Sequence, residues 1–374
     1  MVEYWSPKPI VRVRFLPRLP EILINFKKMS YVIQKTLPVA TDIIQEFPIS
    51  IDIEQSVKNH RQEIRNILEG KDSRKLLIVG PCSAWPSEAV IEYTKKMQPI
   101  NEKVKDKIKI IIRIYTQKPR TTIGWTGPFN HPNPFDQPDI EEGIKYVRKM
   151  MIEVAKQNFP MADEALFTHN DGYVVDLLSW IAIGARSTED QEHRIFASMI
   201  PHPVGIKNPT SGNIRIGINS LIAAQHSHIF AINGKQVNTS GNLHTHIILR
   251  GGGGKTNFQL EKIQKTYDLL IKNNIKNPGI IVDASHDNSL DNTGKKDENL
   301  QPKVIFDVLN NIKDKPKLFD TVKGFMVESF LQPGNQNLNK AQKFEDLEFG
   351  VSVTDPCLDF EKTKDMIFDL HKEL

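Results

Sequence analysis

From about residue 75 onward, the sequence alternates between short apolar runs and longer amphipathic segments. The short runs are rich in Ile and Val, which is typical of buried parallel strands, and the segments between them have the 3.6-residue period of covering helices. About eight such repeats in roughly 300 residues favour a closed α/β fold, the (β/α)8 TIM barrel, over an open sheet. The expected strands span residues 75–80, 108–115, 161–167, 180–185, 203–208, 245–251, 279–285 and 322–329.

Three segments stand apart from this alternation. Residues 1–28 are rich in Pro and Arg, and we expect them to form a disordered or leader-like extension. Residues 29–72 have helical periodicity and predict an N-terminal helical extension. The remaining residues, 73–374, form the expected barrel, and a β-hairpin turning at Asn233-Gly234 is inserted into it at residues 226–241.

Composition excludes several classes of protein. No apolar run approaches the roughly 18–20 residues of a membrane span, so no membrane association is expected. The 49 basic and 45 acidic residues are too evenly balanced to indicate nucleic-acid binding. The chain has two cysteines, Cys82 and Cys357, which excludes a disulfide framework and fits a reducing compartment. We therefore expect a cytoplasmic protein.

Cations recur where the expected strands end. In "IIIRIYTQKPRTT", residues 110–122, a β-branched strand runs directly into several positive charges. Because the carboxyl ends of barrel strands converge on one mouth, these cations should meet there, and they need anions between them. We infer a small substrate with more than one anionic group, such as a phosphate and a carboxylate. The cations are Arg113, Lys118, Arg120, Arg186, Lys207 and Arg250.

A second set of strand-end residues has the chemistry of metal ligands. Cys82, His286, Glu328 and Asp355 offer a thiolate, an imidazole and two carboxylates, which together could hold one divalent ion. His244 and His246 form a competing pair, because residues two apart lie on one face of a strand. The pattern of residues alone does not separate these two metal hypotheses.

Several motifs together resemble type I 3-deoxy-D-arabino-heptulosonate 7-phosphate (DAHP) synthases of the class regulated by aromatic amino acids. The likeness runs from about residue 35 to the C-terminus. It rests on motifs that occur in order: "GPCS" (80–83), "KPRTT" (118–122), "GARSTEDQEHR" (184–194), "PVGIKNPTSGN" (203–213), "DASHDNS" (283–289), "FMVES" (325–329) and "SVTDPC" (352–357).

This resemblance implies that phosphoenolpyruvate condenses with erythrose 4-phosphate to give DAHP and phosphate, the first step of the shikimate pathway. It implies a divalent metal ion (Mn, Fe, Co or Zn) as cofactor, a homodimer or homotetramer, and feedback by Phe, Tyr or Trp through the helical extension and the hairpin. The implied metal ligands are Cys82, His286, Glu328 and Asp355, and the implied catalytic residues are Lys118, His286 and Glu164. The implied phosphoenolpyruvate contacts are Arg113, Lys118, Arg186, Lys207 and Arg250, and those to erythrose 4-phosphate are Arg120 and Thr121.

One departure from the family pattern concerns the substrate pocket. The family usually has a lysine after "TTIGW", where this sequence has Thr126, and His131 is a candidate to replace the missing cation. Two other functions remain open. The chain could use another aldose acceptor with phosphoenolpyruvate, although "KPRTT" argues against it. It could also be a non-catalytic regulatory paralogue, but such a protein would typically have lost Lys118 or a metal ligand, and none is lost.

Overall fold

The computed structural model describes residues 30–120, 123–232 and 234–374. The expected extension at residues 1–28 and the candidate residue Thr121 lie outside these ranges. The chain divides into two units, Met1–Leu37 and Pro38–Leu374. Of the first unit, the described residues 30–37 contain no helix and no strand.

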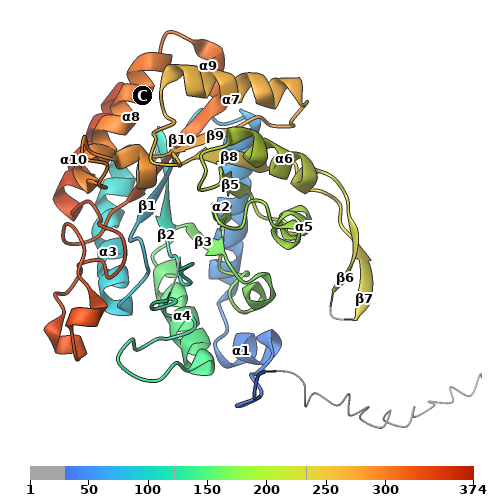
Figure 1. Ribbon diagram of the computed structural model, residues 1–374, viewed down its shortest axis with the longest axis vertical. Coiled ribbons are helices and arrows are strands. Elements are labelled where there is room, and N and C mark those ends of the chain that lie inside the picture. The colour runs from blue at the N-terminus through green and yellow to red at the C-terminus, as the bar shows by residue number, and fades with distance from the viewer. Residues whose placement is uncertain (1–29, 121–122, 233) are drawn as a thin grey trace, which may run out of the picture. The chain divides into compact units, whose positions relative to one another are not determined.

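The second unit contains a closed barrel of eight parallel strands (Figure 1). Neighbouring strands in the barrel follow the order of the chain, with only the hairpin set aside. Almost every strand residue is buried, because helices cover the outer face and side chains fill the interior. The barrel expected from the sequence is therefore confirmed. Its strands are β1 (Lys75–Gly80), β2 (Ile108–Arg113), β3 (Met161–Ala165), β4 (Trp180–Ile183), β5 (Val204–Lys207), β8 (Thr245–Leu249), β9 (Ile280–Asp283) and β10 (Val322–Glu328).

Helices follow the strands and surround the barrel (Figure 1). Their apolar faces pack on the outer side chains of the sheet in one large core. They are α3 (Ser87–Val104), α4 (Ile140–Ala155), α5 (Gln191–Met199), α6 (Ile214–Gln225), α7 (Leu260–Lys272), α8 (Gln301–Ile312), α9 (Pro316–Thr321) and α10 (Phe360–Glu373). Among the described residues, none of these helices combines the length and the apolar character that crossing a bilayer requires.

Two helices precede the barrel, α1 (Ala40–Glu46) and α2 (Ile51–Glu69). Ser50 caps the start of α2 by accepting a hydrogen bond from the Ile53 N–H, and Gly70 ends it with a φ of 75°. Ile64, Ile67 and Leu68 of α2 pack with the side chains that fill the barrel interior. This apolar face closes the amino-terminal end of the barrel and leaves the opposite end for a site.

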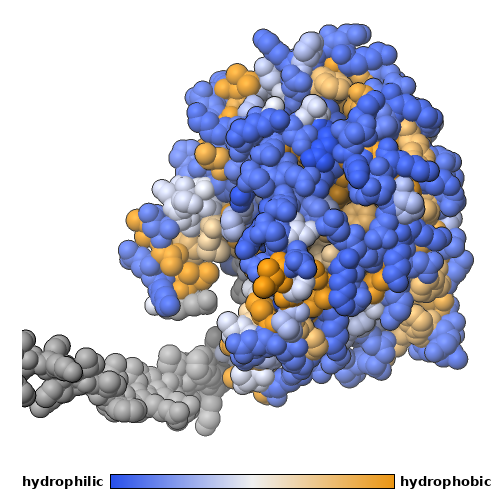
Figure 2. All heavy atoms as spheres, turned by 180° about the vertical axis from the view of Figure 1, so that it is seen from behind, coloured by the Kyte–Doolittle hydropathy of each residue, from blue (hydrophilic) through white to orange (hydrophobic). Residues whose placement is uncertain are grey.

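The predicted hairpin is also present. Strands β6 (Ile229–Ile232) and β7 (Lys235–Asn238) pair antiparallel and form a separate two-stranded sheet between α6 and β8. Figure 2 shows apolar atoms gathered on this hairpin, where Ile229 is 70% exposed.

Candidate active site

A cavity of about 290 Å³ opens at the carboxyl ends of the barrel strands. Strand register brings these ends together, for example by pairing Gly80 of β1 with Glu328 of β10. Glu328 itself is fully buried and is not among the lining residues, but it contacts residues that are. The candidate residues that line the cavity are Cys82, Arg113, Lys118, Arg120, Glu164, Arg186, Lys207, Arg250, His286 and Asp355.

Arg113 and Glu328 form a buried ion pair beneath this cavity. The guanidinium Nη2 lies 2.7 Å from Glu328 Oε1, and Nε donates to the Pro81 carbonyl over 3.0 Å. The guanidinium also lies 3.7 Å from the centre of the Tyr115 ring, a cation–π contact. Burial opposes the charge on each partner, but the attraction between them outweighs it. The pKa of Arg113 is therefore raised and that of Glu328 is lowered, so both groups stay ionised.

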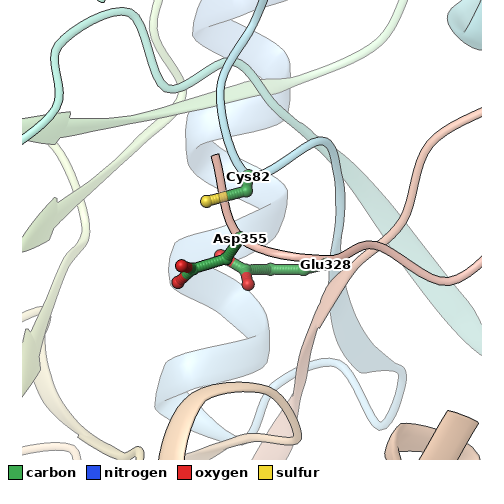
Figure 3. Close-up of side chains that lie close together, drawn as sticks. All are labelled: Cys82, Glu328 and Asp355. Atoms are coloured by element: carbon green, nitrogen blue, oxygen red, sulfur yellow. The ribbon is translucent and has the colours of Figure 1, made fainter. Parts of the chain in front are cut away.

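Three of the four predicted metal ligands gather in one cluster. The Cys82 thiol and the carboxylates of Glu328 and Asp355 point toward one another (Figure 3), and their ligand atoms all lie within 4.8 Å of one another. Burial and the nearby Glu328 carboxylate raise the pKa of the Cys82 thiol, whereas Lys118 opposes this shift. Thiolate and carboxylate donors suit several first-row divalent ions, so the residues present fit a metal site.

His286, the fourth predicted ligand, lies beside this cluster rather than within it. Its Nε2 is 4.0 Å from Glu328 Oε1, and its Nδ1 is 3.0 Å from Asp283 Oδ2. Burial lowers the pKa of His286 despite the adjacent Asp283 carboxylate. A neutral imidazole with a carboxylate beside one nitrogen can bind a metal through the other.

The competing histidine pair has other partners. His244 Nε2 lies 2.7 Å from Glu69 Oε1 of α2. His246 is buried in the barrel and accepts a hydrogen bond from Trp180 Nε1 over 3.1 Å. Neither histidine belongs to the Cys82, Glu328 and Asp355 cluster. Among the described residues, candidate ligand atoms therefore gather around Cys82, Glu328 and Asp355 and not around the histidine pair.

Lys118 reaches the metal-ligand cluster from the loop that follows β2. Its Nζ donates to the Cys82 carbonyl over 2.7 Å and lies 3.2 Å from the Cys82 Sγ. Burial opposes the charge, but Cys82 and the nearby carboxylates raise the pKa of Lys118 overall. An ammonium at this point can donate a proton to an oxygen that is bound in the cavity.

The cations on the other side of the cavity are held by carboxylates. Lys207 Nζ lies 3.3 Å from Asp283 Oδ2, and Arg250 Nη2 lies 3.3 Å from Asp287 Oδ1. Fixed positions reduce the conformational entropy that these side chains would lose on binding an anion. They therefore form a rigid cationic wall.

The Glu164 side chain, on β3, lines the cavity and lies close to Gly184. A Cβ atom at Gly184 would lie 2.2 Å from Glu164 Oε1, so Gly184 provides the space that this carboxylate occupies. Close by, Asp163 Oδ1 accepts hydrogen bonds from the N–H groups of Thr116 and Glu164 and so joins the ends of β2 and β3.

Two features differ from the sequence-based expectations or extend them. His131 hydrogen bonds to the Asp136 carbonyl and is not a lining residue, so it does not replace the cation missing at Thr126. Lys296 does line the cavity, although the sequence had not indicated it. Lys296 lies in the loop after β9, well beyond the end of the strand, so its position along the sequence does not place it at the mouth of the barrel. Only the path of that loop brings it to the site.

Comparison with known proteins agrees with this geometry. The model of the DAHP synthetase I family matches residues 46–367. The "Phospho-2-dehydro-3-deoxyheptonate aldolase, Tyr-sensitive" of Salmonella typhimurium is 37% identical over 333 residues, covering 88% of this chain and 90% of that protein. The "Phospho-2-dehydro-3-deoxyheptonate aldolase, phenylalanine-inhibited" of Saccharomyces cerevisiae is 36% identical over 335 residues, covering 87% of this chain and 88% of that protein.

A solved structure extends the likeness to three dimensions. The phospho-2-dehydro-3-deoxyheptonate aldolase of Francisella tularensis superimposes with a TM-score of 0.85 at 35% sequence identity, covering 92% of this chain and 98% of that one. Both the family match and the identities extend over most of the chain. The chain belongs to the DAHP synthetase I family.

Proposed function

We propose that the protein is a DAHP synthase, which condenses phosphoenolpyruvate with erythrose 4-phosphate and water to give DAHP and phosphate. The observation that supports this most strongly is the meeting of a cationic wall and a cluster of metal-ligand residues in one cavity. Both substrates are phosphorylated and one is also a carboxylate, so together they need several cations. The names of the relatives point to the same reaction.

The cations divide between the two substrates. Arginine binds phosphate and carboxylate through paired hydrogen bonds, whereas lysine acts as a compact charge. Arg120 lies nearer the solvent, in the loop after β2, and we assign it to the phosphate of erythrose 4-phosphate together with Thr121. The phosphoenolpyruvate site comprises Arg113, Lys118, Arg186, Lys207 and Arg250.

The residues of the chain direct the reaction through position and charge. Carbon 3 of phosphoenolpyruvate attacks the aldehyde carbon, and Lys118 delivers a proton to the aldehyde oxygen, which becomes a hydroxyl group. Water, which Glu164 orients, then adds to carbon 2. As the C–O bond to the phosphate breaks, carbon 2 becomes the ketone of DAHP, and the two protons of the water pass to the Lys118 amine and to the departing phosphate. The cationic wall aligns both substrates and stabilises the departing phosphate.

Cys82, His286, Glu328 and Asp355 would hold the divalent ion. The ion would supply Lewis acidity toward a carbonyl oxygen next to Lys118. His286 takes part through this site, with its Nδ1 lying 3.0 Å from the Asp283 carboxylate. The mixed sulfur, nitrogen and oxygen donors are compatible with Mn, Fe, Co or Zn.

Regulation by an aromatic amino acid is part of the proposal. A largely apolar cavity of about 730 Å³ lies between α5 and the hairpin, with Phe196 on one side and Phe230 and Ile232 on the other. Its volume and apolar walls suit an aromatic side chain, and Glu192 at its edge suits the amino group of an effector. Tyr-sensitive and phenylalanine-inhibited relatives support this assignment. We also propose a cytoplasmic homodimer or homotetramer, with residues 29–72 and the hairpin in its contacts.

One assay tests the proposed reaction. The purified protein is treated with a chelator, reloaded with single divalent metals, and supplied with phosphoenolpyruvate and a panel of aldose phosphates while phosphate release is measured. We expect turnover with erythrose 4-phosphate, no turnover after chelation, and inhibition by at least one aromatic amino acid. Preference for another aldose would instead indicate a related synthase. Binding of phosphoenolpyruvate without any turnover would indicate a non-catalytic paralogue.

A further inference from the structure

Lys296 forms an ion pair with one member of the metal-ligand cluster. Its Nζ lies 2.5 Å from Asp355 Oδ2, and both side chains line the active-site cavity. The two side chains are partly shielded from solvent, with 30% of Lys296 and 41% of Asp355 exposed. This ammonium therefore occupies the side of the cluster that faces the cavity.

The loop that carries Lys296 is built to hold it there. Leu290 and Lys296 form an antiparallel bridge, and the Asp297 N–H donates to the Ser289 carbonyl over 2.8 Å. Asp291 closes the loop by accepting hydrogen bonds from the N–H groups of Thr293 and Lys295. The loop follows the short 3-10 helix His286–Ser289, whose first residue lines the cavity, so the loop continues directly from the wall of the site.

Charge explains why a lysine stands at this position. Cys82, Glu328 and Asp355 place two carboxylates and a thiol within 4.8 Å of one another, an arrangement that is unfavourable without a cation. Arg113 neutralises Glu328 from below, where both side chains are buried. Lys296 contacts Asp355 from the cavity side and occupies one of the two carboxylate oxygens that Asp355 could offer to a metal ion.

We propose that the Lys296 ammonium is a built-in placeholder for the divalent ion: it pairs with Asp355 when the site is empty and must release that carboxylate for the ion to bind. This inference rests on the proposed function, because it takes the cluster as the metal site. Lys296 then lowers metal affinity in two ways, by competing for Asp355 and by repelling a second cation nearby. By lowering the affinity, it keeps the metal exchangeable.

An alternative role for Lys296 makes the opposite prediction. If the ammonium held Asp355 in the orientation that binds the ion, its loss would weaken metal binding, as loss of residues supporting a metal ligand does. Metal affinity therefore separates the two roles by the sign of the change. Turnover is not needed as a readout.

The experiment measures the dissociation constant for Mn²⁺ by competition with a fluorescent chelator at fixed pH and ionic strength. Lys296→Met removes the charge at nearly constant length, and Lys296→Arg keeps the charge. Lys295→Met is the matched control, because Lys295 is the exposed neighbour in the same loop and does not line the cavity. Circular dichroism and thermal melts establish that each variant is folded.

We expect Lys296→Met to bind Mn²⁺ more tightly by about ten-fold, with Lys296→Arg and Lys295→Met close to the wild type. Equal or weaker binding by a folded Lys296→Met protein overturns the proposal, and so does a similar gain in Lys295→Met. Failure of the wild type itself to bind a divalent ion contradicts the metal site of the proposed function, which is a separate result.

Discussion

Arg113 and Glu328 lie 2.7 Å apart, and no more than 1% of either side chain is exposed. The pair links Arg113, which lines the cavity, to the metal-ligand cluster, because Glu328 belongs to that cluster. The side chain of Ser285 strengthens the link, since its hydroxyl donates to Glu328 Oε2 over 2.6 Å. One carboxylate thus serves both halves of the site, and a change to its partner should affect stability and chemistry together.

Replacing Arg113 with Met should leave the Glu328 charge buried without its partner. Breaking a buried ion pair in this way typically costs about 3–5 kcal/mol in the free energy of unfolding. Denaturant titration measures the loss. Lys303→Met is the control, because the Lys303–Asp307 pair on α8 is exposed and its loss should cost less than about 1 kcal/mol. Equal losses in the two variants would contradict the role of the buried pair.

Lys118→Met should lower kcat by about 10²–10⁴-fold, the usual contribution of a positioned acid. The ammonium contacts the Cys82 carbonyl and sulfur, and no other lysine makes these contacts among the described residues. Steady-state kinetics with both substrates measures the effect, with Lys105→Met as an exposed lysine control. A Lys118→Met enzyme with near-normal kcat would exclude Lys118 as the proton donor.

Cys82 and Cys357 should form a disulfide when the metal-free protein is oxidised. The Cys82 N–H donates to the Cys357 Sγ over 3.3 Å, and both thiols are free in the structure. Hydrogen peroxide would take up the two electrons, and both thiol protons would be lost. We expect thiol titration to find no free cysteine, metal binding to be lost, and dithiothreitol to restore both. In Cys357→Ser protein no intramolecular disulfide can form, so a reversible loss of the same extent would refute this explanation.

A bulky side chain in the hairpin cavity should abolish feedback and spare catalysis. Ala231 of β6 lines this cavity and is exposed, so Ala231→Trp fills space without disturbing the core. We expect at least a five-fold rise in the concentration of aromatic amino acid needed for half inhibition, at unchanged basal rate. Lys235→Ala, on β7 and outside the cavity lining, is the control. Unchanged inhibition of Ala231→Trp would place the effector elsewhere.

Asp163 should make stability depend on pH. Burial raises the pKa of Asp163 to about 7, although hydrogen bonds from Thr116 and Glu164 oppose the shift. Between pH 5 and pH 7 the carboxyl is therefore protonated in the folded protein and ionised in the unfolded chain, so stability falls as pH rises through this window. Between pH 5 and pH 8, the free energy of unfolding of the wild type should fall by about 2–3 kcal/mol more than that of Asp163→Asn.

Denaturant titrations at pH 5 and pH 8 measure this dependence. Asp52→Asn is the control, since Asp52 is exposed on α2 and its replacement should leave the pH dependence of the wild type intact. If wild type and Asp163→Asn lose the same stability between these pH values, the carboxyl is ionised throughout and the prediction is wrong.

Much of the fold could be predicted because its signals are local. Burial on both faces makes each parallel strand a continuous apolar run, and each covering helix has a period of 3.6 residues. The run "KLLIVG" and seven runs like it therefore predict the eight barrel strands, which are β1 to β10 apart from the hairpin strands β6 and β7. Predicted strand ends extended one or two residues too far at several strands. At β3, for example, the strand ends at Ala165 rather than at residue 167, because the apolar run continues into the loop.

The sequence by itself determined the barrel and the cationic residues at the strand ends, because parallel strands of a closed sheet must all end at the same mouth. The tertiary structure alone decided which groups touch. Only the tertiary structure pairs His286 with Asp283, Arg113 with Glu328, and Lys296 with Asp355. It also places the Trp180 indole where it donates a hydrogen bond to His246. These contacts depend on loop paths and on register between distant strands, and no local period in the sequence encodes them.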